Sequence, residues 1–99
     1  MADAQLVEND DGSWLLKGEL GFAQVPAVLK HAGVNMLGKK PLTVDLKGVS
    51  RADSAGLALL VEWLRESEAA GNTIKFVNVP AQLLSIARLC GLDDILSLN

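Results

Sequence analysis

The spacing of apolar positions divides the first half of the chain into strands and a helix. Two short β-rich segments, residues 5–8 and 14–19, flank a cluster of turn-forming residues at 9–12, and this pattern predicts a hairpin. Apolar residues then recur with helical spacing between residues 25 and 32, and Gly33 suits the end of that helix. The chain is therefore expected to open with two strands and one helix.

Strand and helix alternate in the second half. A short apolar segment at 42–44, ending at Asp45, predicts a strand, and residues 73–77 predict its companion after a long helix that begins near Ser54. A strand, helix, strand order of this kind predicts two parallel strands with a right-handed crossover. A last helix is expected from about residue 80 to 89 or 90, where Gly91 ends it.

Length and hydropathy narrow the class of protein. A chain of 99 residues is expected to form one domain, residues 1–99, around one core. Hydrophobic residues make up 49% and the mean hydropathy is +0.27, yet apolar runs are broken well before the ~18 residues that a membrane span needs. The N-terminal residues lack the basic and apolar regions of a secretory signal. We expect a cytoplasmic protein with no direct membrane insertion.

Charge and residue counts disfavour several kinds of partner. The net charge of −3 and the pI near 4.9 argue against binding a phosphate backbone, so no nucleic-acid partner is expected. The single cysteine, Cys90, excludes an internal disulfide, and the single histidine, His31, leaves no cluster with metal-ligand spacing. We expect no cofactor or metal, a buried Cys90 that acts as a small hydrophobe, and a monomer in isolation.

One polar segment stands between a strand and the long helix, and it places Asp53 and Ser54 at the start of that helix. Free backbone N–H groups and the positive end of the helix dipole favour an oxygen acceptor or an anion there. Both residue types are favoured N-caps, so Ser54 could serve only to cap the helix. Alternatively, the small neighbours Ala55 and Gly56 clear side-chain bulk, so that another protein can approach the backbone. The residues alone leave both interpretations open.

The long helix is apolar over an unusually wide arc. At about 100° per residue, Leu57 and three further leucine or valine residues share one arc, and Leu59 and Trp63 lie beside it. The apolar sector spans roughly 200°, about twice the ~100° that docking one face requires. Neighbouring helices could cover the excess. The alternative is a partner surface centred on Leu59 and Trp63, partly exposed in the free protein, with tryptophan as the anchor.

The Asp-Ser-x-Gly motif of Asp53, Ser54 and Gly56, within residues 44–60, resembles the signature of the STAS domain. The likeness spans nearly the whole chain and includes residues 17–20 and 22–26. It implies an α/β fold in which about three or four helices cover a mixed sheet of about four strands. It also implies a module that acts through a protein partner.

Two branches of the family match. Residues 51–60 look most like the STAS subunit of the Mla-type phospholipid-transport ABC complex of Gram-negative bacteria, which rests on the cytoplasmic ATPase and maintains outer-membrane lipid asymmetry. The motif is also similar to that of the anti-sigma-factor antagonists, in which the matching serine is phosphorylated by an anti-sigma factor kinase. The resemblance implies that the protein binds the ATPase, or alternatively is an antagonist regulated at Ser54. The residues expected to contact the partner are Arg51, Asp53, Ser54, Ala55, Gly56, Leu59 and Trp63.

An enzymatic function is disfavoured by the surroundings of Ser54. A nucleophile elbow needs glycine two residues before and two residues after the serine, and this chain has Ala52 and Gly56. The sequence gives no reason for the only histidine, His31, to reach Ser54 as a base. Glycine-rich phosphate-binding motifs are also absent from the sequence. We therefore expect no catalytic residues.

Overall fold

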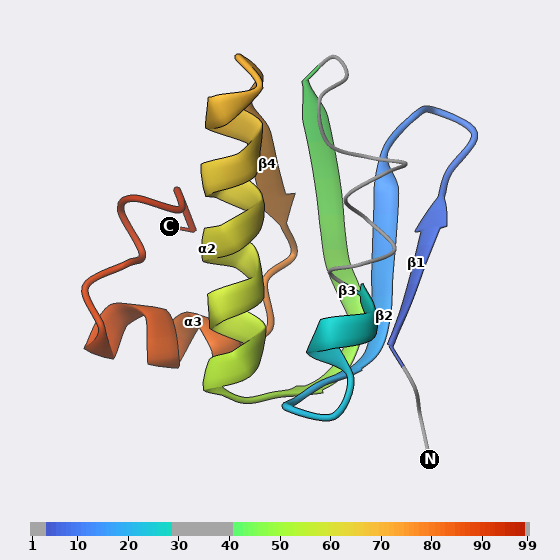
Figure 1. Ribbon diagram of the computed structural model, residues 1–99. Coiled ribbons are helices and arrows are strands. Elements are labelled where there is room, and N and C mark those ends of the chain that lie inside the picture. The colour runs from blue at the N-terminus through green and yellow to red at the C-terminus, as the bar shows by residue number, and fades with distance from the viewer. Residues whose placement is uncertain (1–3, 29–40, 99) are drawn as a thin grey trace.

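A four-stranded mixed sheet forms the framework of the protein (Figure 1). The computed structural model describes residues 4–28 and 41–98. The first pair of strands is antiparallel and the other two pairs are parallel, which confirms the predicted mixed sheet. In their order across the sheet, the strands are β1 (Gln5–Glu8), β2 (Trp14–Leu20), β3 (Leu42–Ala52) and β4 (Ile74–Val77).

Two helices, α2 (Ser54–Ala69) and α3 (Ala81–Leu89), lie on the side of the sheet formed by β3 and β4 (Figure 1). Helix α2 connects β3 to β4 and packs against both strands, and α3 packs against α2 and β3. Residues 25–28 are helical as well, at the start of the predicted first helix. The rest of that predicted helix lies outside the described residues.

Strand β3 is longer than the sequence pattern predicts. Asp45 was expected to end the strand, but β3 continues through the polar segment to Ala52 and pairs with β2 along most of its length. Its register shifts twice against β2, so the simple alternation of apolar and polar residues is lost there. At Gly48 an added Cβ would lie 2.5 Å from the Cβ of Lys17, so only glycine allows the two strands to approach this closely.

The core lies between the sheet and helices α2 and α3. Leu16 of β2, Val44 and Leu46 of β3, and Leu60 of α2 are fully buried there. Residues 93–98, to which the sequence pattern assigns no structure, form hydrogen-bonded turns after α3. Leu96 is one of two leucines from these turns that join the core, so the C-terminal segment is part of the fold.

Candidate functional site

The junction between β3 and α2 is built around the N-cap of α2. Asp53 has an extended backbone, and its Oδ1 accepts a hydrogen bond from the backbone N–H of Ala55 at 2.8 Å. Its own N–H donates to the carbonyl of Leu20, at the end of β2, at 3.2 Å. Asp53 therefore caps the helix and ties the junction to the neighbouring strand.

Ser54 is the first helical residue, and its side chain is exposed. Within the described part of the chain, its hydroxyl makes no hydrogen bond, because Asp53 already supplies the cap. The predicted position of Ser54 at the start of the helix is confirmed. An exposed hydroxyl at a helix N-terminus can donate to or accept from a partner group, and the helix dipole favours a negative charge there.

Ala55 and Gly56 face the interior of the protein. Ala55 is only 9% exposed, and an added Cβ at Gly56 would lie 3.1 Å from both the Cβ and the carbonyl oxygen of Leu20. The small size of these residues lets the first turn of α2 pack closely against the end of β2. Glycine at position 56 therefore does not clear space for an approaching protein, because the place that its side chain would occupy lies against β2.

Leu59 and Trp63 are core residues. Leu59 is 1% exposed and Trp63 is 0% exposed, so the predicted partial exposure of both side chains is wrong. Helix α2 packs against the sheet and against α3, and these contacts bury Leu59 and Trp63, whereas Val61 and Leu64 of the same apolar arc are half-buried. A partner surface centred on Leu59 and Trp63 is therefore excluded in this fold.

An apolar groove of about 400 Å³ opens beside Ser54, and we call it the α2–α3 groove. Its walls come from α2 and from the residues that follow α3, and Cys90, expected to be buried, is exposed here. At its rim Arg65 forms an ion pair with Glu62 at 2.6 Å, and this hydrogen-bonded pairing raises the pKa of Arg65. The groove is lined by Ser54, Leu57, Ala58, Val61, Glu62, Arg65, Cys90 and Leu92.

The sequence pattern missed this groove. Cys90, which lines it, is predicted from the sequence to be a small buried hydrophobe. The signal that could have found the groove is the row of apolar residues at spacings of three and four, Leu57 or Ala58 followed by Val61, on the side of α2 that faces the end of α3.

A smaller notch of about 190 Å³ lies on the other side of the junction. It is lined by the loop after β2, the end of β3 and the first turn of α3. Arg51 lines it with an exposed side chain, which makes no ion pair within the described residues. At its wall the Oε1 of Gln82 accepts a hydrogen bond from the backbone N–H of Ala52 at 3.3 Å. Arg51, the N-cap residue Asp53 and the first turn of α3 therefore lie around one notch.

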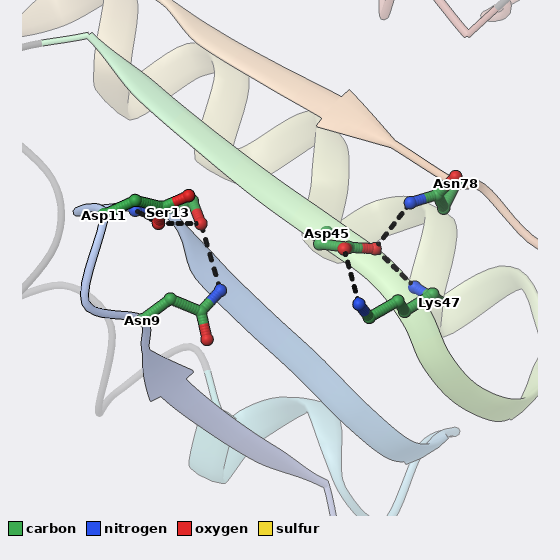
Figure 2. A network of polar contacts seen from close by, with 6 residues as sticks. All are labelled: Asn9, Asp11, Ser13, Asp45, Lys47 and Asn78. Carbon is green, nitrogen blue, oxygen red and sulfur yellow. Dashed lines mark hydrogen bonds and ion pairs between the residues drawn. The ribbon is translucent and has the colours of Figure 1, made fainter.

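Asp45 serves a structural role within β3 (Figure 2). Its Oδ1 accepts hydrogen bonds from the backbone N–H of Lys47 at 2.9 Å and from the side-chain amide of Asn78 at 3.1 Å, and the Lys47 ammonium lies 3.7 Å from Oδ2. Partial burial alone would raise the pKa of Asp45, but these hydrogen bonds and the Lys47 charge together lower it. The contact with Asn78 links β3 to the segment between β4 and α3.

Neither a metal centre nor a membrane span is found in the described ranges, residues 4–28 and 41–98. No group of three or more potential metal-ligating side chains occurs there. None of the described helices is long and apolar enough to cross a membrane. The features that stand out at the α2 end of the molecule are thus an exposed hydroxyl, an apolar groove and a polar notch.

Comparison with known proteins finds matches along almost the whole chain. The family described as "Mlab, STAS domain" matches residues 10–97. The "Intermembrane phospholipid transport system binding protein MlaB" of Haemophilus influenzae is 34% identical over 90 residues, which cover 87% of this chain and 86% of that protein.

Two solved structures share the fold. The anti-sigma factor antagonist SpoIIAA in its unphosphorylated form has a TM-score of 0.72 at 19% identity, covering 92% of this chain and 83% of its own. An anti-sigma factor antagonist from Mycobacterium paratuberculosis has a TM-score of 0.67 at 20% identity, covering 96% of this chain and 82% of its own. At these identities the likeness establishes the arrangement of strands and helices alone.

Proposed function

Since the chain belongs to the STAS domain family, we propose that it is a non-catalytic accessory subunit that binds the ATPase of a phospholipid-transport ABC complex. The 34% identity with a Haemophilus influenzae protein named for intermembrane phospholipid transport supports this assignment. Through its partner the protein would lie at the cytoplasmic face of the inner membrane. It would contribute there to the lipid asymmetry of the outer membrane.

The observation that carries the proposal is the continuity of Ser54 with the α2–α3 groove. Ser54 lines the groove at the start of α2, and its hydroxyl has no hydrogen-bond partner within the described residues. Protein interfaces combine an apolar centre with a polar rim. An apolar side chain of the ATPase would enter the groove, while a polar group of the ATPase would bond to Ser54. The exposed Arg51 and Asp53 would complete the polar rim on the other side of Ser54.

The test is a pull-down of the tagged chain from its native cells, in which the Ser54→Glu variant is compared with the original sequence. Glutamate in the first turn is compatible with the helix dipole, so the fold should persist. Its bulk and charge at the end of the groove should lower recovery of the ABC ATPase about tenfold or more. Recovery of the ATPase at the original level by a folded Ser54→Glu variant would contradict the proposal.

Thr73→Glu is the matched control for this substitution. Thr73 is exposed, carries a hydroxyl, and lies after the far end of α2, just before β4. Its backbone carbonyl, which accepts from the N–H of Leu42 at 3.0 Å, is unchanged by the substitution. The control therefore adds the same group at the other end of the helix, and ATPase recovery should stay at the original level.

The exposed hydroxyl of Ser54 also favours a second candidate, an anti-sigma-factor antagonist regulated by phosphorylation of Ser54. A phosphate at this helix N-terminus would be stabilised by the dipole and by free N–H groups. Two results distinguish the candidates. The native pull-down would recover a serine kinase in place of an ABC ATPase. Ser54→Ala would leave an antagonist able to bind but unable to switch, whereas a subunit that uses the hydroxyl as a contact would lose affinity.

A further inference from the structure

Among residues 4–28 and 41–98, no strand pairs with the second half of β3 on its β4 side. The pairing of β3 with β4 ends at Asp45 and Val77, although β3 continues to Ala52. Backbone N–H groups on this edge bond to side chains: that of Lys47 to Asp45, and that of Ala52 to Gln82. Because Ala52 is buried, its N–H would otherwise lack a partner.

From this geometry we infer that Gln82 is a positioning residue for partner binding, an inference that rests on the proposed function. Its hydrogen bond joins the first turn of α3 to the residue two positions before Ser54. This bond therefore fixes the position of α3 relative to the first turn of α2, which begins at Ser54. Gln82 itself lies on the notch and does not line the α2–α3 groove.

The position of α3 matters because the far wall of the groove follows its C-terminal end, at Cys90 and Leu92. Helix α3 has 9 residues and is therefore about 13 Å long. A rotation of about 10° at its first turn would move the other end by roughly 2 Å over this length. A shift of that size changes the width of the groove relative to Ser54.

Loss of the Gln82 bond should not unfold the protein. Leu83 and Ala87 of α3 are both 0% exposed and hold the helix against the core. Their packing resists separation of α3 from the core, whereas the Gln82 bond adds a directional contact at one end. The expected effect of losing that bond is a change in the position of α3.

The experiment compares Gln82→Met with Gln82→Glu in the full chain. Methionine keeps the length and helix propensity of glutamine but lacks its strong acceptor, whereas glutamate keeps an acceptor oxygen. Hydrogen exchange of the Ala52 amide is measured by NMR. Affinity for the purified ATPase subunit of the phospholipid-transport complex of the same organism is measured by calorimetry.

Gln82→Met should accelerate exchange at Ala52 and weaken binding by about 2- to 30-fold, the range of mutations that act through a coupled element. Gln82→Glu should restore both measurements to within about twofold of the original. Unchanged Ala52 exchange in Gln82→Met, unchanged affinity despite faster exchange, or a failure of Gln82→Glu to restore binding would each overturn the inference.

The Ser54→Glu variant separates this inference from the proposed function. If Ser54→Glu loses binding while Gln82→Met binds like the original, only the role of Gln82 is refuted. If a folded Ser54→Glu binds like the original, the proposed interface is refuted, and the role of Gln82 in binding is refuted with it.

Discussion

The side chain of Ser67 is expected to destabilise the protein. Ser67 lies on α2 with 0% exposure, and its hydroxyl has no hydrogen-bond partner among the described residues. A buried polar group without a partner costs about 1–3 kcal/mol relative to one in water. Ser67→Ala removes that group and adds up to about 0.5 kcal/mol of helix propensity. The lost contacts of one oxygen atom offset part of this gain, at about 0.1–0.2 kcal/mol for each atom pair.

The predicted net effect of Ser67→Ala is a gain of about 1–2 kcal/mol in the free energy of unfolding. For a domain of this size each kcal/mol corresponds to about 4–8 °C in Tm, so Tm should rise by roughly 4–16 °C. Urea unfolding followed by circular dichroism measures the free energy, and a thermal melt measures Tm. The denaturant m-value should remain unchanged, because the same surface is exposed on unfolding.

Ser85→Ala is the matched control, because Ser85 is an exposed serine inside α3. It should gain only the propensity difference of up to about 0.5 kcal/mol. The difference between the two variants isolates the buried hydroxyl. If Ser67→Ala were less stable than the original protein, the reasoning would be refuted, because the hydroxyl must then make a favourable hydrogen bond.

Two further predictions concern the packing of the core and the loss of stability at low pH. Trp63→Ala should lower the free energy of unfolding by about 3–5 kcal/mol because the indole is fully buried, and a melt shifted by only a few degrees would contradict that. The pKa of Asp45 is lowered in the folded protein, so its ionised carboxylate stabilises the fold at pH values above the ordinary pKa of 3.8. This stabilisation is lost as the pH falls through the lower pKa of the folded state. In urea titrations Asp45→Ala should therefore have a lower free energy of unfolding than the original protein at neutral pH. This difference in free energy should become smaller in strong acid and should not become smaller in base.

The elements that the sequence predicts well are those with a strong local signal. The hairpin turn, the parallel pair around α2, and the start of α2 at Ser54 depend on apolar spacing and on cap residues within a few positions of one another. The second half of β3 lacks such a signal. Its apolar residues, Leu46, Val49 and Ala52, are three positions apart and do not alternate as in a regular strand. Its register against β2 shifts twice, and Gly48 is explained only by the close approach of Lys17.

Leu59 and Trp63 show the limit of reasoning from one helix. A helical projection counts the apolar arc but does not say how many neighbours cover it. In the fold, α2 contacts both the sheet and α3, so Leu59 and Trp63 are buried although the apolar arc is about twice the usual width. Only the tertiary arrangement distinguishes a wide buried arc from an exposed anchor.

The α2–α3 groove could not be read from the sequence for a related reason, since its walls come from segments about thirty residues apart. Its concave shape depends on small side chains, because Ala58 and Cys90 leave space that larger residues would fill. A surface hollowed in this way accepts a large apolar side chain and does not present one. If the proposed interface is correct, the aromatic or aliphatic anchor therefore belongs to the ATPase. The only tryptophan of α2 is then free to serve the core, which is where the structure places it.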